Sequence, residues 1–213
     1  MPFDHNAHYH DLLLREVPPS CRRALDVGCG TGEFARKLAR RGIEVDAVDA
    51  DGQVISTARE LSSAPDSRGG VRFEQADITA VDLPPGRYDY VSCLACIHHV
   101  PFETVGRLRA SLTDHGVLVI LGCYREATPR DHLVSLAAVP VNAAARAAVF
   151  LREKWAGGHG GPAERPVPAP VKPPSMSLPE IRAESAALLP GRRIRRLLFW
   201  RYLLVFRNGP GGA

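Results

Sequence analysis

Lysine is scarce in this chain of 213 residues. Of its 27 basic residues only Lys37, Lys154 and Lys172 are lysines, and the rest are arginines. An arginine bias can serve phosphate binding, but it more often reflects genome composition, and the formal net charge of +4 is mild. Charge alone therefore singles out no partner.

A secretory signal and a long apolar run are also missing. The opening stretch "MPFDHNAHYHDLLL" has no basic segment followed by an apolar core. The most apolar late stretch, "IRRLLFWRYLLVF", is too short to cross a bilayer and is interrupted by arginines. The five cysteines are an odd number at irregular spacings, so we expect reduced thiols. These features predict a cytoplasmic protein without a membrane span.

A complete set of metal ligands is missing as well. The segment "SCLACIHHV" brings together Cys93, Cys96, His98 and His99, but zinc needs four ligands, normally from two separated pairs. The remaining cysteines are isolated: Cys21, Cys29 and Cys123. A redox C-x-x-C pair would need a helix N-terminus to lower the pKa of its thiol. We therefore predict neither a metal site nor a redox pair.

The chain does contain a regular alternation of short apolar runs and segments of helical period. The expected strands cover residues 24–27, 43–49, 71–77, 88–94 and 117–122, and the expected helices cover 33–42, 53–61 and 101–112. This order implies parallel pairing with right-handed crossovers, which is a doubly wound α/β sheet.

The pattern changes after Gly122. Residues 130–155 predict a helix that breaks at Pro140, and residues 156–179 predict a loop or mobile linker. Ser177 and Glu180 have the spacing of a capping box, so a helix restarts there. Strands expected at 192–198 and 201–207 would form an antiparallel edge. The prediction is one domain with a mostly parallel, seven-stranded sheet.

The stretch "ALDVGCGTGEF" is the most informative one. In a doubly wound sheet the ligand lies outside the carboxyl ends of the strands, where the first strand turns into the first helix. Gly28, Gly30 and Gly32 would let the backbone approach a ligand closely there. Glu33 occupies the place where a dinucleotide fingerprint has its third glycine, which disfavours a nicotinamide cofactor.

Carboxylates stand at the strand ends that surround this turn. Asp49 ends the second expected strand, about 20 residues after the first glycine, where a carboxylate can bind both ribose hydroxyls. Asp77 ends the third and precedes the apolar Ile78, a pair suited to an adenine amino group and ring face. Asp26 lies inside the first strand. The pattern predicts an adenosine-type ligand, while loop stabilisation is the alternative role for Asp26 and Asp49.

These residues carry a resemblance. The stretches "LDVGCGTG", "AVDAD", "FEQADI" and "YDYVSCLACIHHV" resemble the ordered motifs of class I S-adenosylmethionine-dependent methyltransferases, which have a Rossmann-like fold. They are most similar to the small-molecule branch with ubiquinone- and menaquinone-type enzymes. The resemblance covers about residues 20–125, and more loosely the terminal "RRIRRLLFWRYLLVFRN".

The resemblance implies a cofactor site and a division of the chain. Residues 28–32 would lie against the methionine portion, Asp49 would hold the ribose, and the Leu94 backbone would face the methionine amino group. The implied cofactor-binding set is Asp26, Gly28, Cys29, Gly30, Gly32, Asp49, Ala50, Asp77, Ile78 and Leu94. Residues 1–20 would form a helical cover, 21–125 the cofactor-binding core, 126–190 a helical lid with a Pro/Gly-rich loop, and 191–213 the closing strands and tail.

The two histidines are the candidate catalytic residues. His98 and His99 follow the fourth strand, where one of them would face the substrate and could accept a proton. The alternative is that they cap the next helix or order the pocket, because alignment alone supports many methyl transfers. Tyr9 is a second candidate for substrate contact, through an N-terminal segment folded over the cofactor. Its alternative is a helix that packs Leu12, Leu13 and Leu14.

Other features bear on the substrate. Enzymes that methylate exocyclic amines of DNA or amide nitrogens resemble one another in an Asn/Asp-Pro-Pro-aromatic run after the fourth strand, and its absence here argues against N-methylation of bases. The apolar segment 133–151 suggests a hydrophobic substrate or a partner surface. One basic cluster is expected to form a solvated face, with a nucleic-acid surface as the alternative. Its members are Arg192, Arg193, Arg195, Arg196, Arg201 and Arg207.

The predicted function is therefore methyl transfer from S-adenosylmethionine, with S-adenosylhomocysteine as product, to a small, apolar molecule at O, C or N. We expect no nucleic-acid partner. Two alternatives stay open: a protein that binds S-adenosylmethionine without transferring its methyl group, and an NAD-type oxidoreductase.

Overall fold

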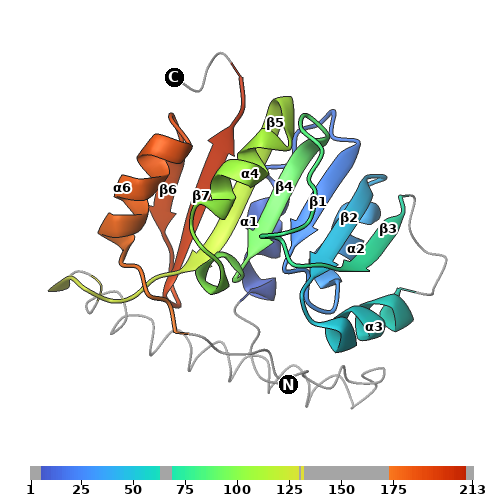
Figure 1. The fold of residues 1–213 in the computed structure, drawn as a ribbon, viewed down its shortest axis with the longest axis horizontal. Coiled ribbons are helices and arrows are strands. Elements are labelled where there is room, and N and C mark those ends of the chain that lie inside the picture. The colour runs from blue at the N-terminus through green and yellow to red at the C-terminus, as the bar shows by residue number, and fades with distance from the viewer. Residues whose placement is uncertain (1–5, 63–68, 130, 132–172, 210–213) are drawn as a thin grey trace, which may run out of the picture.

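The computed structural model describes residues 6–62, 69–129, 131 and 173–209. Their strands form one seven-stranded sheet in the order β3-β2-β1-β4-β5-β7-β6 (Figure 1). The strands are β1 (Arg23–Val27), β2 (Glu44–Asp49), β3 (Val71–Gln75), β4 (Tyr88–Leu94), β5 (Leu112–Cys123), β6 (Arg193–Arg196) and β7 (Arg201–Arg207). The predicted α/β class and sheet are confirmed.

The first five strands are parallel to one another, and β7 runs antiparallel to both of its neighbours, β5 and β6. β1 pairs with β2 on one side and β4 on the other, so the strand order reverses at β1. The carboxyl ends of the parallel strands point downward in Figure 1. Ligands of doubly wound sheets bind at this end, beside the reversal point.

Helices cover both faces of the sheet. They are a short 3₁₀ helix (Ala7–Tyr9), α1 (His10–Leu14), α2 (Glu33–Ala39), α3 (Gly52–Leu61), the 3₁₀ helix η2 (Ile97–His99), α4 (Thr104–Ala110) and α6 (Leu178–Leu188). Side chains from α1, α2 and α3 pack on one face of the sheet, and this group of buried residues is named the first core cluster. Side chains from α4 and α6 pack on the other face, the second core cluster.

The capping box at the start of α6 is present as predicted. The Ser177 side chain accepts from the Glu180 backbone, and the Glu180 carboxylate accepts from the Ser177 backbone. Several boundaries differ from expectation, among them the start of β5, which is Leu112 rather than residue 117, and the following two. α4 ends at Ala110 rather than 112, because Leu112 already pairs with Tyr88 as the first residue of β5. β3 ends at Gln75, before the expected Asp77.

The prediction that the arginine cluster is a solvated face is wrong for Arg196. Its side chain is only 17% exposed and lies 2.5 Å from the carboxylate of Asp131, which is fully buried. The guanidinium also lies 5.7 Å from the centre of the Tyr124 ring. Arg193 and Arg195 are exposed as expected. The difference arises because alternate residues of β6 face the protein interior.

Several expectations lie outside the described residues. The helix expected at 130–155, with its break at Pro140, and most of the expected lid fall there. Within the described part of the chain, none of the helices is both long and apolar enough to pass through a membrane.

Candidate functional site

The turn after β1 forms a cradle at the carboxyl end of the sheet. The backbone N–H groups of Gly28 and Cys29 donate to the Val48 carbonyl, at 2.8 and 3.0 Å. Gly28 has φ +65°, and a Cβ there would lie 2.4 Å from the Cys96 Cβ. Gly30 has φ +55°, and a Cβ there would meet no described atom within 4 Å. The turn thus packs against Cys96 on one side and leaves open space at Gly30.

Asp49 joins the cradle to the end of β2. Its Oδ2 accepts from the Gly30 N–H and its Oδ1 from the Asp51 N–H, both at 3.0 Å. The alternative role of loop stabilisation is therefore present in the structure. An ionised carboxylate offers about four acceptor positions, so the two remaining positions can serve ribose hydroxyls.

Asp26 is a buried carboxyl group beneath the same turn. It is 1% exposed, and burial raises its pKa to about 7, with a further contribution from the charge of Asp49. Its Oδ1 accepts from the Ser92 hydroxyl at 2.7 Å, whereas Oδ2 has no hydrogen-bond partner among the described residues. A buried oxygen of this kind requires a partner, so the cradle fits a ligand with a donor group.

The turn after β3 carries the other predicted adenine contacts. Asp77 is exposed and its Oδ1 accepts from the backbone N–H and the hydroxyl of Thr79, at 2.8 and 2.7 Å. These hydrogen bonds lower the pKa of Asp77. Ile78 is 5% exposed and belongs to the second core cluster. Ala50 is exposed, and its carbonyl accepts from Gln75 Nε2 at 3.2 Å.

Two residues of the site, Arg107 and Ala95, were not predicted from the sequence. Arg107, on α4, donates to the carbonyls of Ile78, Thr79 and Val81, so it holds the turn after β3. Ala95, directly after Leu94, has φ +51°, a conformation that few non-glycine residues adopt and that is enriched at functional sites. Neither has a local sequence signal, because both depend on contacts between distant segments.

The two histidines lie in different environments. His99 is exposed, whereas His98 is half-buried and lines a small cavity. The N-cap residue of α4 is Glu103, four residues after His99. Their ring centres are 4.1 Å apart. Of the two histidines, His98 is the one that lines this cavity, and a catalytic role for either stays a prediction.

Tyr9 lies away from the His98 cavity. Its ring is 7% exposed in the first core cluster, and its hydroxyl donates to the Leu198 carbonyl at 3.1 Å. Leu13 is fully buried in the same cluster. The helix-packing alternative is therefore present, and substrate contact by Tyr9 stays a prediction.

The cysteines near the turn are thiols rather than thiolates. A hydrogen bond with Cys96, together with burial, raises the pKa of Cys93, and burial raises the pKa of Cys29. Within the described ranges, no three His, Cys, Asp or Glu side chains are grouped to hold a metal ion.

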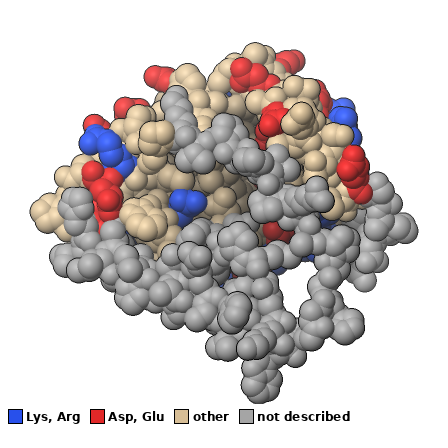
Figure 2. All heavy atoms as spheres, turned by 90° about the horizontal axis from the view of Figure 1, so that it is seen from below, with Lys and Arg blue, Asp and Glu red and all other residues tan. Residues whose placement is uncertain are grey.

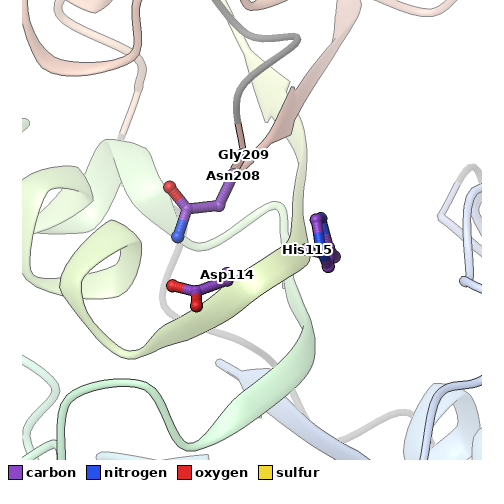
Figure 3. Close-up of a pocket in the computed structure, with 4 residues that line it drawn as sticks. All are labelled: Asp114, His115, Asn208 and Gly209. Carbon is purple, nitrogen blue, oxygen red and sulfur yellow. The ribbon is translucent and has the colours of Figure 1, made fainter.

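Figure 2 shows the molecule from the end of the sheet that carries these residues, with acidic and basic side chains scattered over the coloured part of this face. A different depression lies at the opposite end, lined by Asp114 and His115 of β5 and by Asn208 and Gly209 after β7 (Figure 3). It is open, and Asn208 Nδ2 is already bonded to the Thr113 carbonyl. It has no part in the site described above.

Comparisons with known proteins agree with this geometry. A family model for a methyltransferase domain matches residues 24–116. An uncharacterized methyltransferase of Mycobacterium tuberculosis is 35% identical over 212 residues, which are 97% of each chain. The magnesium-protoporphyrin O-methyltransferase of Rhodobacter capsulatus is 37% identical over 103 residues, which are 47% of this chain and 45% of that protein.

A solved structure has the same fold. A SAM-dependent methyltransferase of Aquifex aeolicus superposes with a TM-score of 0.58 over 93% of this chain and 89% of that chain, at 15% identity. At that identity the likeness concerns the fold alone.

Proposed function

Because the chain belongs to the class I S-adenosylmethionine-dependent methyltransferase family, we propose that it methylates a small, largely apolar molecule at an oxygen, carbon or nitrogen atom. The observation that carries the proposal is the buried Asp26 oxygen without a described partner, beneath a glycine turn that Asp49 holds in place. The relative named as an O-methyltransferase supports oxygen as one candidate atom.

In this proposal different residues of the chain bind different parts of the cofactor. Residues 28–32 and Asp26 hold the methionine portion, Asp49 accepts from the ribose hydroxyls, and Ala50, Asp77 and Ile78 surround the adenine. The Leu94 backbone accepts from the methionine amino group. The bound cofactor supplies an electrophilic methyl group on a sulfonium.

The chain's own contribution to the transfer is alignment and proton handling. His98 lines a cavity with apolar side chains, so it can orient an acceptor group and take its proton. His99 is exposed, so it has a smaller role than His98 in orienting the acceptor group and taking its proton. Alignment itself supplies much of the rate when the donor is already activated.

The test is calorimetric titration with S-adenosylmethionine and S-adenosylhomocysteine. Asp49→Ala removes the ribose acceptor, and we expect a loss in affinity of at least about 150-fold, the size of two charge-assisted hydrogen bonds of about 1.5 kcal/mol each. The matched control is Asp46→Asn on the same strand, where Asp46 accepts from the Tyr88 hydroxyl at 2.9 Å, away from the strand end. Circular dichroism checks that each variant is folded.

The outcomes separate the proposal from its two alternatives. No binding to the folded wild type, with binding of a nicotinamide cofactor instead, would favour an oxidoreductase. Binding lost only in Asp49→Ala supports the methyltransferase site. Formation of S-adenosylhomocysteine with any member of a panel of phenols, quinols and amines then distinguishes an enzyme from a protein that only binds the cofactor.

A further inference from the structure

A small cavity lies next to His98, between η2, the end of β5, the start of β7 and the beginning of α6. Its volume is about 30 Å³. It is lined by Ile97, His98, Val100, Phe102, Cys123, Pro174, Ser175, Met176, Ile181 and Tyr202. A volume of this size holds a single water molecule or one oxygen atom of a larger ligand, and not a whole small molecule.

Tyr202 is the fully buried polar side chain in this lining. Its hydroxyl has no hydrogen-bond partner among the described residues. Burial raises the pKa of Tyr202. The hydroxyl therefore stays protonated and is available as a donor.

Gly122 makes this position of the Tyr202 ring possible. Gly122 and Tyr202 are register partners on β5 and β7. A Cβ at residue 122 would lie 2.3 Å from Cζ and 2.4 Å from the hydroxyl oxygen of Tyr202. The end of the ring thus lies directly across the glycine, in space that any other residue would fill.

A tyrosine in this place is costly unless its hydroxyl has a partner. A buried hydroxyl without an acceptor loses its hydrogen bonds to water and forms none within the protein. Phenylalanine would fill the same space without this desolvation penalty. Tyr202 lines a cavity whose other members are mostly apolar, with Phe102, Met176 and Ile181 among them. What is missing is one hydrogen-bond acceptor.

We propose that this cavity is an oxygen subsite for the substrate, in which the Tyr202 hydroxyl donates a hydrogen bond to a hydroxyl or carbonyl oxygen. The rest of the substrate is apolar, because the residues that line the cavity beside Tyr202 are mostly apolar. The inference rests on the proposed function, and it names the substrate class: an apolar molecule that carries at least one oxygen. Tyr202 is then a specificity-determining residue.

The test compares phenol with toluene, which has a methyl group in place of the hydroxyl. Both probes are titrated into the full chain saturated with S-adenosylhomocysteine. The chain has five tyrosines, so ring-¹³C-labelled tyrosine gives an NMR spectrum simple enough to follow, and the signal absent from Tyr202→Phe identifies Tyr202. We expect phenol to shift that signal and to bind the wild type about tenfold more tightly than Tyr202→Phe, the effect of one hydrogen bond.

Toluene, which cannot accept the hydrogen bond, should bind the wild type and Tyr202→Phe with equal affinity. Tyr90→Phe is the matched control, since Tyr90 is also fully buried but its hydroxyl donates to the Leu13 carbonyl in the other core cluster. This variant should keep the wild-type affinity for phenol.

Three outcomes would overturn the inference: phenol binding that is equal in the wild type and Tyr202→Phe, phenol binding without a shift of the Tyr202 signal, or no phenol binding at all. In the last case an ordered water is the occupant of the cavity. Failure of the wild type to bind S-adenosylhomocysteine counts instead against the proposed function, so the two failures are distinguishable.

Discussion

Replacing Asp26 by asparagine should change how the stability of the protein depends on pH. Asp26 is almost fully buried, and burial raises its pKa from the ordinary 3.8 to about 7. Asparagine has nearly the same shape and can still accept a hydrogen bond from Ser92. It cannot ionise, so the comparison isolates the cost of charging this one group.

The sign and size follow from the two pKa values. Below pH 3.8 the carboxyl group is protonated in both states. Between 3.8 and about 7 only the unfolded state releases the proton, so the free energy of unfolding of the wild type falls as pH rises. Above about 7 both states are ionised and the loss is complete. At about 1.4 kcal/mol per pH unit the full loss is about 4 kcal/mol.

Urea unfolding of the ligand-free protein from pH 5 to pH 9 measures this effect. The free energy of unfolding of Asp26→Asn minus that of the wild type should grow by about 3 kcal/mol between pH 5 and 8, and then stay constant. Ser92→Ala removes the hydrogen bond that lowers the pKa of Asp26, so the loss should extend to higher pH. A difference between Asp26→Asn and wild type that does not vary with pH would refute the reasoning.

Two further predictions concern the turns of the site. Gly28→Ala should lower the free energy of unfolding in urea by about 2–4 kcal/mol, because residue 28 has a left-handed backbone and the added Cβ would overlap with Cys96. Gly30→Ala should lower it by only about 1 kcal/mol, because a Cβ at residue 30 meets no described atom within 4 Å. Equal losses would contradict the close approach to Cys96. Arg107→Met should weaken S-adenosylhomocysteine binding about tenfold in calorimetry, because the turn after β3 loses its donors. Arg109→Met, whose arginine binds the Leu188 carbonyl on α6, is the control, and equal affinities would rule out a positioning role.

Local patterns were sufficient for the class and strand composition of the sheet, while the cofactor contacts of the candidate residues stay predictions. A short apolar run in the sequence predicts a buried strand, and β4 was predicted in this way at its observed bounds, 88–94. The capping box of α6 depends on two residues three positions apart, and it too was correct. The positions of Asp49 and of the glycine turn follow from the rule that parallel strands end at the same edge.

Contacts between distant segments decided the rest. Arg107 holds a turn that is almost 30 residues earlier in the chain, Arg196 meets Asp131, and Tyr202 lies across Gly122. The pKa of Asp26 depends on its burial beneath neighbouring strands. A periodic pattern tells which way a side chain faces but not which atoms it meets there. Hydrogen bonding and desolvation act over a few ångströms in space, so these features appear only once the strands are paired and the helices are packed.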